Sequence, residues 1–157
     1  MAETTHAPRG IAATCHVETA AGPVAMAETP GRGFAVLTRL PSGALGFRQL
    51  IKVVSVADAP LVRVTLDDGH VVLVASGHPF YRLGMEPVPA HRLAPGDLLE
   101  TAFGYPDGYA PPDAARPCRG RATAVRAVEA AGTGTVLTGT VRETHALFLT
   151  AGVLCGE

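Results

Sequence analysis

The chain has 157 residues, a length that fits one domain with its own hydrophobic core. Its formal net charge of −1 gives no electrostatic reason to expect nucleic acid or an anionic membrane surface as a partner. No apolar run reaches the length of a membrane span, and residues 1–11 lack the hydrophobic region of a secretory signal. Three cysteines are too few for a disulfide framework in a chain this long. We therefore expect a soluble, cytoplasmic protein.

Along the chain, a small and polar stretch at 1–14 predicts a flexible leader, and a β-rich body follows at 15–157. Asp68-Gly69 lies between two valine-rich runs, 61–66 and 70–74, and predicts a tight hairpin because Asp-Gly supplies the positive φ that such a turn needs. No segment sustains a helical period. The other predicted strands fall within 34–40, 45–56, 93–99, 122–130, 135–143 and 146–155.

The range 103–119 is rich in Gly, Pro, Tyr and Asp, which predicts a long loop. Tyr105 and Tyr109 lie in it among prolines, where they could bind a partner, although such aromatics more often pack down onto the core. A weak internal similarity aligns 70–77 with 145–152, which indicates either a duplicated β unit or a coincidence between valine-rich strands.

Three short segments hold the residues that could carry chemistry. Cys15 stands in Ala-Thr-Cys-His near the start, His78 follows an apolar run in Ser-Gly-His-Pro-Phe, and His145 opens the apolar run that ends the chain. In this order they resemble the Hint domain, the self-processing module shared by hedgehog C-terminal domains and inteins. The resemblance covers about residues 15–155. It implies an all-β, disc- or horseshoe-shaped fold of short strands in two related halves, with the chain ends near the active site.

The resemblance implies that the chain's own N-terminal segment is the substrate, cut at the Thr14–Cys15 bond. The Cys15 thiol would attack the Thr14 carbonyl through a five-membered ring and give a thioester, an N–S acyl shift in which the tether brings the two groups together. His78 is the candidate for the proton step, because the pKa of imidazole lies near neutrality. The family's usual threonine before this histidine is replaced by Ala75, and Ser76 is the only hydroxyl nearby.

The C-terminal run departs from the family's pattern. Gly156 and Glu157 stand where a His-Asn pair would be, and Thr138 takes the place of an acidic residue. We therefore expect N-terminal cleavage without splicing, a single-turnover reaction in cis, with water, a thiol or another added nucleophile resolving the thioester. His145 would carry or orient a proton, or be a structural histidine in a turn like its counterpart His70.

Two alternatives remain open at this stage. The same departures are those of a catalytically decayed Hint module that serves in protein binding or assembly, and an unrelated β-barrel-like binding protein with structural histidines would also fit. Cys15 and Cys155 could approach each other as a disulfide or, with two histidines, as a zinc site. The spacing fits no compact zinc motif, so we predict no metal or other cofactor.

Overall fold

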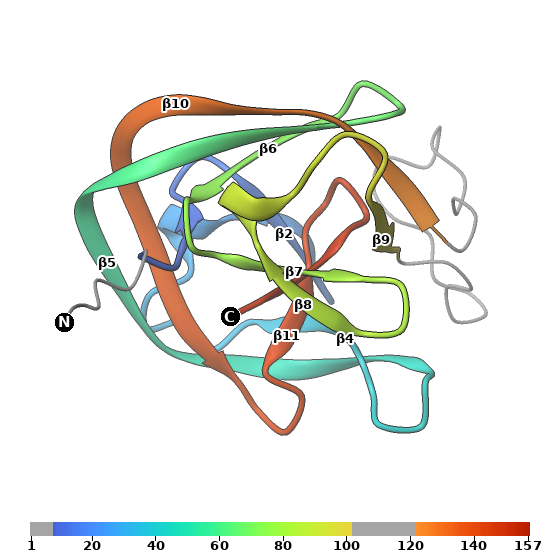
Figure 1. Ribbon diagram of the computed structural model, residues 1–157. Helices are drawn as coiled ribbons and strands as arrows, with labels where there is room; N and C mark the ends of the chain where they lie inside the picture. Colours follow the sequence, from blue (N-terminus) through green and yellow to red (C-terminus); the bar gives the residue numbers. More distant parts are fainter. Residues whose placement is uncertain (1–7, 102–121) are drawn as a thin grey trace, which may run out of the picture.

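The computed structural model describes residues 8–101 and 122–157, which are almost entirely β (Figure 1). The predicted loop with Tyr105 and Tyr109 lies outside these residues. No helix in the described ranges is long and apolar enough to cross a membrane. Two short 3-10 turns, η1 and η2, cover Met26–Glu28 and Ala90–Arg92. The strands are β1 (Ile11–Ala12), β2 (His16–Thr19), β3 (Gly22–Ala25), β4 (Ala35–Arg39), β5 (Leu45–Leu66), β6 (Val71–Ala75), β7 (Pro79–Arg82), β8 (Glu86–Pro89), β9 (Leu98–Glu100), β10 (Ala122–Val141), β11 (Ala146–Phe148) and β12 (Leu154–Gly156).

Two long strands, β5 and β10, frame the molecule and pair with each other in antiparallel register from Val125↔Leu66 to Val141↔Leu50 (Figure 1). The sequence predicted a break within each, at 57–60 and at 131–134. The structure instead continues both strands through four register shifts, because pairing with the partner strand outweighs the local preference of Ala, Asp, Pro and Gly for turns. Lys52 and Asp58 adopt left-handed backbone conformations along the bend.

The predicted hairpin is confirmed. Gly69 has a φ of 90°, its N–H donates to the Leu66 carbonyl, and β5 pairs with β6 from Leu61↔Ala75 to Thr65↔Val71. The segments that share the internal similarity each run from a turn into a strand, β6 and β11. Their origin by duplication stays a prediction.

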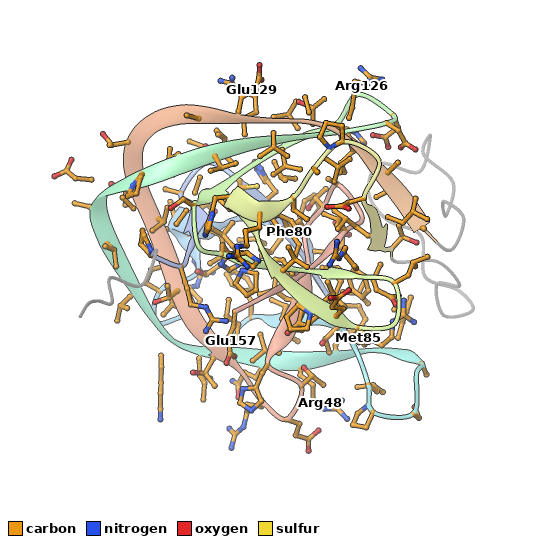
Figure 2. All side chains as sticks on the ribbon, viewed as in Figure 1. Arg48, Phe80, Met85, Arg126, Glu129 and Glu157 are labelled. Carbon is orange, nitrogen blue, oxygen red and sulfur yellow. The ribbon has the colours of Figure 1, made fainter. Side chains whose placement is uncertain are left out.

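The N-terminal residues belong to the fold, which corrects the predicted leader over 8–14. The two-residue strand β1 lies between β10 and β6, where Ile11 pairs with both Leu137 and Val74 and is 1% exposed. Burial of Ile11 and Ala12 explains why this short strand is held in the sheet. Figure 2 shows Phe80 of β7 inside the frame of long strands, whereas Arg126 and Glu129 of β10 point outward from its rim.

Candidate functional site

His78 lies in the buried interior of the molecule. It follows β6 through a turn in which its N–H donates to the Ala75 carbonyl at 2.9 Å, and its ring meets Phe80 edge-on. The side chain is fully buried, and this burial lowers the pKa of His78 to about 3, with the positive charge of Arg9 as a smaller cause. The backbone of Gly156 acts in the opposite direction, although His78 Nε2 makes no hydrogen bond of ordinary geometry with the described residues. The imidazole is therefore neutral at ordinary pH.

The Nδ1 atom of His78 accepts a hydrogen bond from the backbone N–H of Gly10 at 3.1 Å. The carbonyl of Gly10 accepts from the Ala75 N–H at 2.8 Å, and the carbonyl of Pro8 accepts from the Gly77 N–H at 2.8 Å. Because Nδ1 is an acceptor, the neutral ring carries its proton on Nε2. The peptide bond that faces His78 is thus Arg9–Gly10, five residues before the bond predicted from the sequence.

Only glycine fits at residue 10. Its φ is +138°, a region that side-chain-bearing residues rarely adopt, and an added Cβ would lie 2.5 Å from Val136 Cγ2. Val136 of β10 therefore fills the space that a side chain on residue 10 would need.

Cys15 lies in a turn after β1, where its own N–H donates to the Ala12 carbonyl at 2.9 Å. With Thr14 it borders an open cavity of about 370 Å³ that also includes His16, His70 and Thr150. Thr14 is exposed and Cys15 is partly buried. Burial raises the pKa of the Cys15 thiol, and hydrogen bonding from the backbone of Leu73 and His16 offsets part of that rise.

The remaining predicted residues are Ser76, in the turn just before His78, and His145. The backbone of Ser76 forms two hydrogen bonds: its N–H donates to the Pro60 carbonyl, and its carbonyl accepts from the His91 N–H. His145 is largely exposed, and its Nδ1 lies 2.9 Å from Glu157 Oε2.

The C-terminal Glu157 is held on both oxygens, because its Oε1 also accepts from the Val141 N–H at 2.6 Å. Burial raises the pKa of Tyr81, the charges of Cys155 and Glu157 raise it further, and the charge of Arg9 lowers it. Figure 2 shows Glu157 below Phe80.

The structure thus pairs Gly10 with His78 and places Thr14 and Cys15 at a separate open cavity, and both places pack against the same hydrophobic core. Gly10 is the residue that sequence reasoning missed. It has no side chain to mark a role, and the apolar pair after it was the only signal of a strand.

Cys15 and Cys155 are both free thiols. Cys155 is buried, and this burial raises its pKa well above the ordinary value, with the charge of Cys15 as a smaller cause. The described residues contain no group of three or more His, Cys, Asp or Glu side chains arranged to hold a metal ion.

Solved structures share this architecture at low sequence identity. A bacterial intein-like domain from Clostridium thermocellum covers 96% of this chain and 99% of its own length, with a TM-score of 0.76 and 20% identity. A DnaB intein from Synechocystis sp. PCC 6803 covers 95% and 98%, with a TM-score of 0.73 and 11% identity. The gp41-1 intein covers 96% and 99%, with a TM-score of 0.68 and 13% identity.

No family model and no curated protein matches the sequence. The agreement with solved structures extends over nearly the whole length of each chain and confirms the all-β architecture predicted from the order of the motifs. This chain has a Hint, intein-like fold.

Proposed function

We propose that this chain is a Hint-fold module that holds its own N-terminal segment without cutting it and serves in protein binding or assembly. The observation that carries this proposal is the hydrogen bond from Gly10 N–H to the buried His78 Nδ1. It supports a centre whose histidine faces the Arg9–Gly10 bond, where the residue after the bond has no nucleophile.

An acyl shift needs a thiol or hydroxyl on the residue that follows the cleaved bond, because only that side chain can close a five-membered ring onto the preceding carbonyl. Gly10 has no such group, and Val136 occupies its place. The fold therefore keeps the position of the reaction but not the attacking atom.

The protonation state of His78 points the same way. A general acid must carry the proton that it donates to the departing amine. With the pKa of His78 lowered to about 3 by burial, the ring carries almost no imidazolium at pH 7. A neutral ring that accepts from a backbone amide is suited to holding that amide in place.

The backbone bonds of Pro8, Gly10 and Ile11 fit this holding role. The carbonyls of Pro8 and Gly10 accept from Gly77 and Ala75, and Ile11 pairs with strands on both sides. Any polypeptide attached before residue 8 would thus be fixed to the middle of a sheet rather than to a frayed end. That geometry supports a tether for a fused or bound partner.

N–S acyl shift at Thr14–Cys15, with His78 assisting and release of the N-terminal segment, is the second candidate. The open cavity beside Thr14 and Cys15 favours it, because water or a thiol could reach a thioester formed there. Against it stand the raised pKa of the Cys15 thiol and the pairing of His78 with Gly10.

Intact-protein mass spectrometry with and without dithiothreitol or hydroxylamine separates the candidates. We expect the full-length mass under every condition. A fragment that begins at Cys15 and is absent from a Cys15→Ala variant, but present in a Cys118→Ala control, would establish the second candidate. A fragment that begins at Gly10 would contradict the proposal by showing that the bond facing His78 is cut.

A further inference from the structure

One stretch of β5 has an open edge. Residues 45–49 pair with β4 and residues 61–65 pair with β6, whereas the stretch between them pairs only with β10, through Val54↔Thr138, Ser55↔Leu137 and Val56↔Val136. No strand in the described ranges lies along its other edge. Figure 1 places this part of β5 on the outer rim of the frame.

This edge is exposed and partly apolar. Val54 is 56% exposed and Val56 is 42% exposed, and Ser55 and Ala57 are exposed as well. In an antiparallel ribbon every second residue points its N–H and carbonyl away from the partner strand, so the open edge offers unpaired backbone groups. Such an edge is a ready template for another extended chain.

The ends of the stretch carry opposite charges at matching positions. Lys52 and Asp58 are exposed, each lies three residues from Ser55, and each has a left-handed backbone within the continuous strand β5. Neither side chain forms an ion pair among the described residues.

We propose that a second copy of this chain pairs with this edge, antiparallel and centred on Ser55. In that register Lys52 of each copy faces Asp58 of the other, and Val54 faces Val56, twice each. A two-fold interface of this kind is self-complementary, because the same strand meets itself in reverse. This assembly goes beyond the tether proposed above and needs none of the residues around His78.

The contact is small. A stable protein interface buries roughly 1,200–2,000 Å² in total, and a five-residue ladder with two valine pairs falls below that range. We therefore expect a weak dimer whose population rises with protein concentration and falls with salt, since the two ion pairs are exposed.

Charge reversal provides the test, with sedimentation velocity across a range of protein concentration as the measurement. Lys52→Asp places four acidic groups at the interface and Asp58→Lys places four basic ones, so each variant alone should dimerise about tenfold more weakly or worse. Mixing the two variants restores both opposite-charge pairs, and we expect a heterodimer of about the wild-type affinity.

Circular dichroism and thermal unfolding of each variant check that the fold is kept. A second variant, Val54→Lys, should also abolish the dimer without touching the charged ends. The proposal is overturned if the wild-type chain stays monomeric at every concentration, or if it dimerises and the mixed charge variants fail to recover association. Neither result bears on whether the chain cuts itself, which the intact mass reports separately.

Discussion

The surroundings of His78 and those of Cys15 differ in what each lacks. His78 is fully buried, neutral and bonded to the Gly10 amide, whereas Cys15 borders an open cavity and meets the backbone of Leu73 and His16. The first region has the imidazole without a nucleophile, and the second has a thiol whose pKa is raised. Peptide cleavage by acyl shift needs both groups at one bond. In this chain the imidazole therefore faces the Arg9–Gly10 bond, whereas the thiol follows the Thr14–Cys15 bond.

The largest expected difference between the two regions is in how acid changes the free energy of unfolding, because that change arises at His78. Unfolded histidine has a pKa of 6.5, and folded His78 has a pKa lowered to about 3, so between these values the unfolded state binds a proton that the folded state excludes. The stability due to neutral His78 is complete above the unfolded pKa and is lost as pH falls toward 3, by up to about 4 kcal/mol. Urea unfolding of the wild type and of His78→Gln at several pH values measures this loss. Parallel curves for the two proteins would contradict the burial of a neutral His78.

Truncation of the His78 side chain should have the next-largest effect on the free energy of unfolding. His78→Ala removes a buried ring and leaves the Gly10 N–H without its acceptor, which should lower the free energy of unfolding by about 3 kcal/mol. The matched control is His91→Ala, because His91 is exposed in a 3-10 turn and should cost no more than about 0.5 kcal/mol. Hydrogen exchange at the Gly10 amide should accelerate in His78→Ala alone. Equal effects of the two substitutions would contradict the role of buried His78 as the acceptor that holds the Gly10 amide.

Residue 10 itself gives the third test. Gly10→Ala forces a side chain into a φ of +138° and against Val136, and we expect a loss of about 2 kcal/mol. Gly31→Ala is the control, because its φ is also positive but open space surrounds it, so the cost should stay near 1 kcal/mol. Adding Val136→Ala to Gly10→Ala should recover the part of the lost free energy of unfolding that is due to the clash between the two side chains. Independent, additive effects of the pair would show that Val136 does not fill this space.

The sequence predicted the Hint fold and singled out His78, whereas the structure pairs that histidine with Gly10 and not with Thr14 or Cys15. His-Pro-Phe after a valine-rich strand is a local pattern, and the hairpin around Gly69 is equally local, so both could be recognised from neighbours in the chain. The bond from Gly10 to His78 joins residues 68 positions apart, and a glycine followed by a two-residue strand offers no side-chain pattern. The sequence therefore pointed to Cys15, whose side chain is a nucleophile, and not to Gly10, which has no side chain. The continuity of β5 was missed for a related reason, since the pairing with β10 that carries the strand past Asp58 and Pro60 is non-local.

The smallest expected effect concerns Cys15, and it decides the order of the two candidate functions. Because burial raises the pKa of its thiol, little thiolate is present at neutral pH, and iodoacetamide should modify Cys15 about tenfold more slowly than a free cysteine, with the rate rising in alkali. Labelling in a Cys118→Ala background, followed by mass spectrometry of peptides, isolates this thiol from Cys155, which is buried and should react only on unfolding.

Cys15→Ala should meanwhile change the free energy of unfolding by about 1 kcal/mol and leave the exchange of the Gly10 amide unchanged, because that amide is held by His78 and not by Cys15. Fast labelling at neutral pH would mean that the cavity stabilises a thiolate beside Thr14. That result would give the second region the activated nucleophile it is expected to lack, and the acyl shift at Thr14–Cys15 would become the better account of what this Hint fold does.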